Sequence, residues 1–468
     1  MYTYFKFFTL LIFALISACG GGGTSTSTTS AATTTTPALL SIAVTPANPS
    51  LPIGASLQFV ATGTYADGTT AALTTGLTWT SSDPTTATMF TGGLTTAKLA
   101  GVSTVTATSG AIAGATRLTV VGPYMRVAAG GSHTVVIKSN GSVAAWGWNR
   151  TGQLGDGTGT DKLVPTLIGT AVNWTAVAAG ESHTAALQVD GSLWAWGFNQ
   201  NGQLGDGTLV NRLTPTKIGT VSTWVAVSAG KAHTVALKKD GTLWAWGRNF
   251  NGQLGDGTAV DKAAPTQIGT IKTWTNISAG ATHTIARRAD GSIWTWGVND
   301  SGQLGVGTTV SLNVPTQLGT GTWVAIAAGG AHTLAVRADG ALFAWGANLT
   351  GQLGNEISTD SLAPTQVGTD TDWAVVSAGG AHSVAIKSNG TLWAWGANTD
   401  GQVGDFTSLN KFLPVRVGTA SSWLTASAGQ LHTFALRADG SLWGWGRNLE
   451  GQQGNGKLIN LTVPNNLP

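Results

Sequence analysis

The residues with the clearest capacity for chemistry are seven histidines, which recur at steps of 50 residues with a single step of 49. They are His133, His183, His233, His283, His332, His382 and His432. Imidazole can bind metal ions or transfer protons near neutral pH. A symmetric ring of these side chains around a channel could bind a cation. No Asp, Cys or second His stands at a fixed ligand spacing beside them, so we expect each imidazole to satisfy backbone groups between repeats.

Other candidate chemistry is also repeated. Gly-Asp-Gly-Thr runs at 155–158, 205–208 and 255–258 could form calcium or phosphate loops, but they lack the further carboxylates of the first and the Lys of the second. Later units depart from the pattern at Val306, Glu356, Phe406 and Asn455, which favours a turn. Every Ser or Thr near a His is a repeat residue, whereas a catalytic triad converges once. We therefore predict no enzyme activity, no metal and no cofactor.

A fixed period of this size indicates one supersecondary unit copied in tandem. Each unit offers four strand candidates, W-x-x-V-x-A-G, H-T-x-A-L, S/T-L-W-A-W-G and P-T-x-I-G. Asp190-Gly191 and Asp240-Gly241 lie between the second and third, where both turn residues could take positive φ in a tight hairpin. Seven such units predict an all-β fold, a seven-bladed β-propeller over residues 124–468.

The elements AGxxHTxAL, WxWGxNxxGQLG and PTQIGT resemble the repeat of the regulator of chromosome condensation family, a seven-bladed propeller. The resemblance implies that the recurrent residues build the ring. That family includes a nucleotide exchange factor for a nuclear GTPase and an ultraviolet photoreceptor. The photoreceptor places Trp and Arg in the turn before the repeat His, where this chain has Gly131-Ser132, Glu181-Ser182 and Lys231-Ala232. The chromophore cluster is therefore absent.

Residues 38–121 predict an N-terminal immunoglobulin-like β-sandwich. Leu57, Phe59 and Ala61 alternate with polar or small residues, and we expect the core to centre on Trp79. The stretches VTPANPSLPIGASLQFVATGTYADGTT and LTWTSSDPTTATM resemble the group 2 bacterial immunoglobulin-like domain. That resemblance implies a spacer, with a ligand-binding module as the alternative.

The N-terminus predicts export. Residues 1–18 read as a signal peptide, with Lys6, an apolar run over 7–16 and small residues before Cys19. The Ile-Ser-Ala-Cys sequence resembles the lipobox of bacterial lipoproteins, which implies lipidation of Cys19, although an ordinary cleaved signal is the alternative. Residues 19–37 are rich in Gly, Ser and Thr, which predicts a flexible linker. We expect a protein anchored by lipid to the bacterial envelope, at the outer membrane or cell surface.

The remaining composition bounds the partner. A net charge of +3 gives no basic stripe, so nucleic acid is not expected. Function should lie where the repeats differ, since a partner breaks sevenfold symmetry. Two variable positions flank the repeat Asn, and they gather aromatic and Arg side chains in one arc: Trp148, Arg150, Phe198, Arg248, Phe250 and Arg447. Such residues are frequent at binding hot spots, although they could simply cover neighbouring blades.

These observations predict a monomeric, non-catalytic surface lipoprotein whose propeller binds a protein or glycan. Two alternatives remain at this point. A secreted enzyme inhibitor has an analogue in a bacterial propeller of similar repeats that inhibits β-lactamase. A guanine-nucleotide-exchange-factor-like regulator follows from family resemblance alone and would need a cytoplasmic location, which the export signal opposes.

Overall fold

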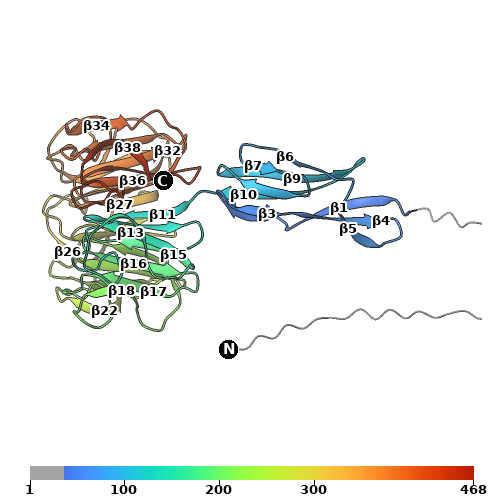
Figure 1. Ribbon diagram of the computed structural model, residues 1–468. Coiled ribbons are helices and arrows are strands. Elements are labelled where there is room, and N and C mark those ends of the chain that lie inside the picture. The colour runs from blue at the N-terminus through green and yellow to red at the C-terminus, as the bar shows by residue number, and fades with distance from the viewer. Residues whose placement is uncertain (1–35, 468) are drawn as a thin grey trace, which may run out of the picture.

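The computed structural model describes residues 36–467, and Figure 1 shows two β-rich parts that meet near residue 122. The predicted signal peptide, Cys19 and most of the predicted linker lie outside the described residues. Within residues 36–467 no helix is long and apolar enough to cross a membrane.

The N-terminal part contains three small sheets, in the strand orders β1-β4-β5, β2-β10-β9-β6 and β3-β8-β7. The strands are β1 (Leu39–Thr45), β2 (Ser50–Pro52), β3 (Ser56–Gln58), β4 (Val60–Tyr65), β5 (Thr70–Leu73), β6 (Thr78–Ser81), β7 (Ala87–Met89), β8 (Leu94–Ala97), β9 (Gly101–Ser109) and β10 (Ile112–Val121). Phe59, Val105 and Leu118 are buried in the core, as the alternation predicted for Phe59. The expectation that the core centres on Trp79 is wrong. This residue lies on the edge strand β6 and is only partly buried.

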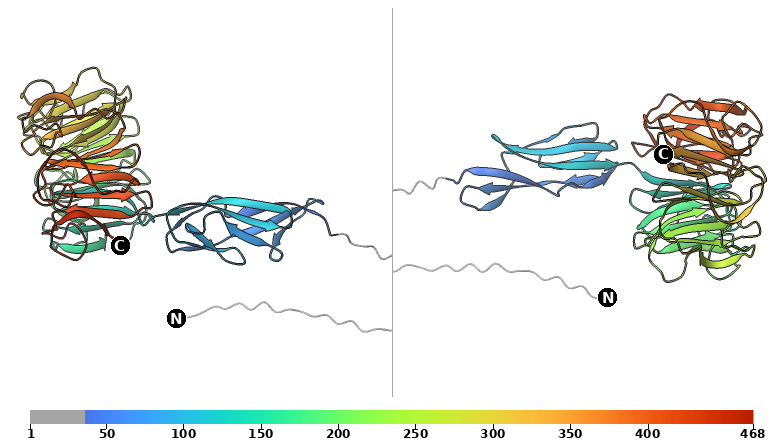
Figure 2. Two further views of the ribbon diagram at one scale, coloured as in Figure 1. Left: turned by 90° about the horizontal axis from the view of Figure 1, so that it is seen from above. Right: turned by 180° about the vertical axis from the view of Figure 1, so that it is seen from behind.

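The C-terminal part is a ring of four-stranded antiparallel sheets, and residues 124–467 form seven of them. Figure 2 shows the ring edge-on, with the immunoglobulin-like part extending from one side. Each blade uses four strands that are consecutive in the sequence.

The first strand of each blade lines the central channel, and the second begins at the repeat His. The first strands are β11 (Tyr124–Ala129), β15 (Trp174–Ala179), β19 (Trp224–Ala229), β23 (Trp274–Ala279), β27 (Trp323–Ala328), β31 (Trp373–Ala378) and β35 (Trp423–Ala428). The second strands are β12 (His133–Lys138), β16 (His183–Gln188), β20 (His233–Lys238), β24 (His283–Arg288), β28 (His332–Arg337), β32 (His382–Lys387) and β36 (His432–Arg437).

The third strand carries the W-x-W-G motif and the fourth forms the outer edge. The third strands are β13 (Val143–Gly147), β17 (Leu193–Gly197), β21 (Leu243–Gly247), β25 (Ile293–Gly297), β29 (Leu342–Gly346), β33 (Leu392–Gly396) and β37 (Leu442–Gly446). The fourth strands are β14 (Lys162–Leu167), β18 (Arg212–Lys217), β22 (Lys262–Gln267), β26 (Leu312–Gln317), β30 (Ser361–Gln366), β34 (Lys411–Arg416) and β38 (Leu461–Leu467). Each outer strand contains a proline, a residue that discourages pairing with another edge.

The hairpin between the second and third strands confirms the predicted antiparallel pair but uses a different turn. In blade 2, the amide of Gly191 donates to the carbonyl of Gln188 at 2.9 Å, and Gly191 has a φ of 77°. Asp190 is not among the described non-glycine residues with positive φ. The loop is therefore one residue longer than a two-residue hairpin turn. The Asp190 carboxylate stabilises it by accepting hydrogen bonds from the amide and hydroxyl of Ser192.

The last Trp of each W-x-W-G motif is fully buried between blades, whereas the first is partly buried where the motif has one. In blade 2, Trp196 packs edge-on against Trp174, with ring centroids 6.0 Å apart. These contacts agree with the expectation that the recurrent residues build the ring. The last blade meets the first through Trp146 and Phe434, whose ring centroids lie 5.8 Å apart.

Candidate functional site

The seven histidines join each blade to the next. Each imidazole is fully buried, and its Nε2 lies 2.9–3.1 Å from a hydroxyl on the second strand of the following blade. The pairs are His133–Thr184, His183–Thr234, His233–Thr284, His283–Thr333, His332–Ser383, His382–Thr433 and His432–Thr134. The last pair closes the ring.

Each of these hydroxyls has a second partner that fixes the tautomer of the His. Thr284 Oγ1 donates to the carbonyl oxygen of Gln253 at 2.9 Å, in the same blade as His233. A hydroxyl that donates its one hydrogen there must accept from the imidazole, so His233 carries its proton on Nε2. Trp296 also donates to the Gln253 carbonyl, at 2.9 Å. The interface between blades is therefore a connected network of hydrogen bonds.

Burial keeps these imidazoles neutral. It lowers the pKa of His133, His183, His283 and His382 to about 3, with the neighbouring histidines adding to the effect, and the pKa of His233, His332 and His432 to about 4. The prediction of a structural role agrees with this geometry, but the expected backbone partners are wrong. Nε2 meets a side-chain hydroxyl, and Nδ1 has no hydrogen-bond partner.

The Gly-Asp-Gly-Thr loops are turns held by the repeat Asn. In blade 1, Asn149 Nδ2 donates to Asp156 Oδ1 at 2.9 Å and to two carbonyl oxygens, those of Thr158 and Thr160. Lys162 Nζ lies 3.1 Å from the other Asp156 oxygen. The amide and ammonium groups engage the oxygens that a cation would need. Among residues 36–467, no group of three His, Cys, Asp or Glu side chains could hold a metal ion.

The propeller has two chemically different faces. The hairpin face carries the turns between second and third strands, and the loop face carries the A-G turns before each His together with the W-G-x-N loops. Residue 122 leads into β11 at the hairpin face, where the amide of Ser139 donates to the carbonyl of Pro123. The immunoglobulin-like domain is thus attached to the hairpin face (Figures 1 and 2), and the loop face is opposite.

Three concentric rings of variable residues cover the loop face. The mouth ring follows each A-G turn at the channel: Gly131, Glu181, Lys231, Ala281, Gly330, Gly380 and Gln430. The inner ring is the position after each W-G, where the Trp148 amide bonds to the Ser132 carbonyl beside the mouth ring: Trp148, Phe198, Arg248, Val298, Ala347, Ala397 and Arg447. The turn-tip ring follows the repeat Asn: Arg150, Gln200, Phe250, Asp300, Leu349, Thr399 and Leu449.

The six residues predicted to bind a partner all lie on this face, in blades 7, 1, 2 and 3. Trp148, Phe198 and Arg447 are partly buried, and Arg150, Arg248 and Phe250 are exposed. One of the six already has a partner within the chain. The Arg447 guanidinium forms an ion pair with the Glu450 carboxylate, at 2.8 Å.

Glu450 and Arg447 shift each other's pKa. The hydrogen bonds that the Arg447 guanidinium donates to the Glu450 carboxylate raise the pKa of Arg447 and lower the pKa of Glu450. Exposure alone does not distinguish the six predicted residues from the rest of the loop face. Leu349 in blade 5 is 78% exposed, and Phe250 in blade 3 is 72% exposed.

The mouth ring holds functional candidates that the sequence interpretation missed. Its large polar members are Glu181, Lys231 and Gln430, in blades 2, 3 and 7, and blades 4 to 6 have only Ala or Gly there. In the sequence, Glu181 and Lys231 stand out only as residues of the turn before the repeat His. The available signal was their variation at one fixed position after A-G. Placing that position at the channel mouth requires the closed ring.

The family models cover most of the described chain. A model of the RCC1-like domain matches residues 91–378, more than half of the sequence. The chain belongs to the RCC1-like family. Models of the regulator of chromosome condensation (RCC1) repeat match 389–436, and also 373–402 and 425–452. A model of the group 2 bacterial Ig-like domain matches 38–120. Both resemblances inferred from the sequence are confirmed, as is the all-β propeller fold.

Solved RCC1-like structures share the architecture. Prp20p from Saccharomyces cerevisiae is 25% identical, with a TM-score of 0.59, over 66% of this chain and 80% of that chain. Human WBSCR16 is 22% identical, with a TM-score of 0.64, over 70% of this chain and 94% of that chain. The second likeness shows the fold alone.

Curated relatives match over shorter segments. Ice-binding protein 1 of Shewanella frigidimarina (strain NCIMB 400) is 32% identical over 142 residues, which are 30% of this chain and 14% of that protein. Human HERC4, a probable E3 ubiquitin-protein ligase, is 46% identical over 46 residues, which are 10% of this chain and 4% of that protein. This chain thus spans a small part of the length of each.

Proposed function

We propose that this RCC1-like protein is a non-catalytic binding protein of the bacterial envelope, and that it presents the loop face of its propeller to a protein partner. The observation that carries the proposal is an asymmetry shared by two rings. The inner ring places its large polar or aromatic residues in blades 7, 1, 2 and 3, and the mouth ring places its large polar residues in blades 7, 2 and 3, with Gly131 in blade 1. Blades 4 to 6 have Ala, Gly or Val at both positions.

This shared asymmetry of the two rings favours a partner that binds off-centre, over the sector formed by blades 7, 1, 2 and 3. A side chain that only covers the neighbouring blade would meet the same need in every repeat, since the seams share one set of hydrogen bonds. Aromatic and Arg side chains are enriched at the energetic centres of protein interfaces. A protein partner also agrees with the solved relative, since Prp20p is described by its binding to Gsp1p and histones. A glycan is the other occupant that the test can reveal.

The attachment of the immunoglobulin-like domain supports display. A lipid at Cys19, followed by a flexible linker and the immunoglobulin-like spacer, would reach the propeller from its hairpin face. The loop face would then point away from the membrane. Envelope localisation and lipid attachment remain proposals that rest on the N-terminal sequence.

Site-specific photo-crosslinking in the native envelope tests the binding sector. A crosslinkable amino acid at position 250 should capture a discrete partner, and the same residue at position 349 should not. Both are turn tips of similar exposure, so Leu349 is a matched control in the opposite sector. Replacing Trp148 with Ala should weaken the crosslink from position 250. Equal capture at 250 and 349, or none at 250 in an intact propeller, would remove the sector from consideration.

A further inference from the structure

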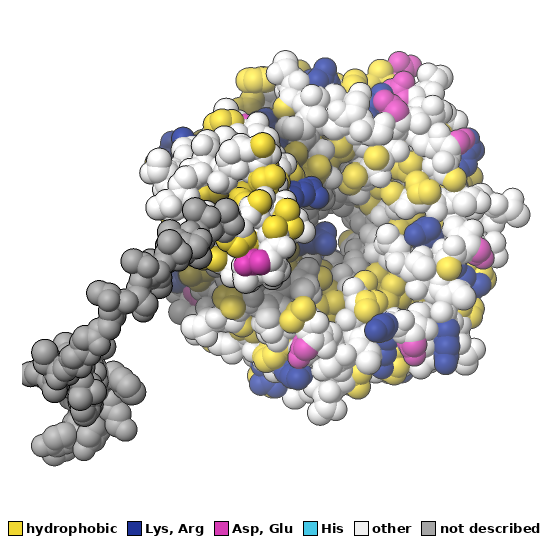
Figure 3. Space-filling view, turned by 90° about the vertical axis from the view of Figure 1, so that its right-hand side faces the viewer, with side chains coloured by type: hydrophobic (Ala, Val, Ile, Leu, Met, Phe, Trp, Pro, Cys, Tyr) yellow, Lys and Arg dark blue, Asp and Glu magenta, His cyan; other side chains and the backbone are white. Residues whose placement is uncertain are grey.

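The mouth of the central channel is a concave site of the size that small molecules use. Its cavity measures about 400 Å³, and most of its wall is Ala and Gly from the first strands and the A-G turns. Small-ligand sites are typically mostly apolar clefts of about 300–1,000 Å³, with a few polar groups that fix orientation. Figure 3, viewed from the side of the immunoglobulin-like domain, shows that the channel is open at the centre of the ring.

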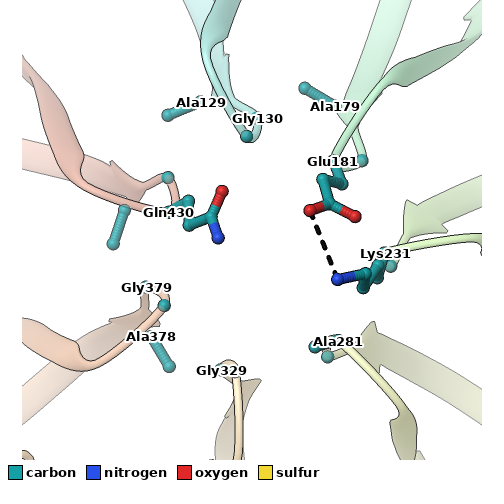
Figure 4. A pocket seen from close by; sticks show the side chains of 18 of the residues that line it. Ala129, Gly130, Ala179, Glu181, Lys231, Ala281, Gly329, Ala378, Gly379 and Gln430 are labelled. Atoms are coloured by element: carbon teal, nitrogen blue, oxygen red, sulfur yellow. Dashed lines mark ion pairs between the residues drawn. The ribbon is translucent and has the colours of Figure 1, made fainter.

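Three polar side chains converge on this mouth. Figure 4 shows Glu181 and Lys231 on one side of the opening and Gln430 pointing in from the other. The Lys231 ammonium lies 3.4 Å from a Glu181 carboxylate oxygen, and the two side chains remain 50% and 33% exposed. The mouth therefore offers one positive group, one negative group and one amide on an otherwise small and uncharged wall.

The Glu181–Lys231 pair is available to a ligand. An exposed ion pair of this kind contributes only about 0–1 kcal/mol, so separating the two groups costs little. No fold requirement explains the pair, because the corresponding positions in blades 4 to 6 are Ala281, Gly330 and Gly380 and those seams have the same His-to-hydroxyl bonds. The pair differs in this respect from Asp156 and Lys162, which hold a loop together.

We propose that the channel mouth binds a small zwitterion, a free α-amino acid. The ligand carboxylate meets Lys231, its ammonium meets Glu181, and Gln430 hydrogen-bonds to it from across the channel. A ligand with one charge is disfavoured, because a carboxylate alone is repelled by Glu181 and an ammonium alone by Lys231. The site does not depend on the proposed protein partner.

Ligand-observed NMR on the full chain tests the site. L-Alanine is the probe, with propionate and ethylamine as analogues that keep one charge each. The expected result is saturation transfer to L-alanine and at least tenfold weaker binding of both analogues. Glu181→Gln and Lys231→Met should each weaken L-alanine binding at least tenfold. The exchanged pair, Glu181→Lys with Lys231→Glu, should restore it, because a zwitterion can reverse.

A matched control separates the site from general surface charge. Asp339 forms an exposed ion pair with Arg337 on the hairpin face, at 2.6 Å, and Asn already occupies its position in two other blades. Asp339→Asn should therefore leave L-alanine binding unchanged. The proposal is overturned if L-alanine shows no transfer at about 10 mM, where a millimolar site would be mostly filled. Equal binding of L-alanine by the wild-type and Glu181→Gln proteins would also overturn it. Failure of the crosslinking experiment at position 250 would contradict the proposed protein-binding sector but not the binding of L-alanine at the channel mouth.

Discussion

Acid should destabilise the propeller through its histidines, and the effect should begin at mildly acidic pH. An unfolded His has a pKa near 6.5, whereas burial lowers the pKa of the repeat histidines to about 3 or about 4. Below pH 6.5 the unfolded chain therefore binds protons that the folded chain does not. The stability that these histidines contribute is complete above pH 6.5 and is lost as the pH falls through the folded-state pKa values of about 4 and about 3.

The magnitude follows from the number of sites. A pH of 5 is about 1.5 units below the pKa of an unfolded His, so each site lowers the free energy of unfolding by about 2 kcal/mol. Seven sites together lower it by about 14 kcal/mol. This loss equals the whole stability of an ordinary domain. Carboxylates titrate mostly below pH 5, so the interval from pH 8 to pH 5 reports the histidines.

The assay is denaturant unfolding followed by Trp fluorescence at a series of pH values, with proton uptake measured in weak buffer. Uptake on unfolding should approach seven protons at pH 5. His283→Gln, which removes one titrating group, should reduce that number by one at the same pH. If stability changes between pH 8 and pH 5 by less than a single proton predicts, the histidines are not buried and neutral, and the account of the seams is wrong.

Three further outcomes are expected. Thr284→Val leaves the buried Nε2–H of His233 without an acceptor and should cost about 2–3 kcal/mol, whereas Thr284→Ser keeps the hydroxyl and should cost about 1 kcal/mol; equal unfolding midpoints for the two variants would contradict the bridge. Phe406 has a φ of 71° and is 76% exposed, so Phe406→Gly should raise the free energy of unfolding by about 0.5–1 kcal/mol, and a lower free energy of unfolding would show that the ring makes contacts worth more than the strain. Metabolic labelling with a fatty acid should mark the protein, and persistence of the label in Cys19→Ala would exclude lipidation at that residue.

The fold could be predicted because one period fixed the unit and each unit carried its own strand and turn signals. The sequence also contains a signal for the hydrogen-bond partner of each repeat His. A hydroxyl residue follows every repeat His, Thr in six blades and Ser383 in one. Adjacent residues of a strand face opposite sides, so a His that faces one neighbouring blade is followed by a hydroxyl that faces the other.

The site was less predictable because it depends on distances across the ring. Glu181 and Lys231 are 50 residues apart in sequence and meet only because consecutive blades place their A-G turns side by side around the channel. The bond between Arg447 and Glu450 depends on rotamers within one loop, which residue types alone do not determine. Variation among repeats located the face, but not the contacts on it.

The ring closes without an exchanged strand, since the first and last blades each pair four strands that follow one another in the sequence. One sequence repeat therefore corresponds to one structural blade. An in-frame duplication of one 50-residue repeat would copy a whole blade, with the His that donates to the next seam and the hydroxyl that accepts from the previous one. The copied blade would carry the same His-to-hydroxyl seam contacts, and new binding specificity can arise by altering one blade's exposed positions while its seams stay unchanged.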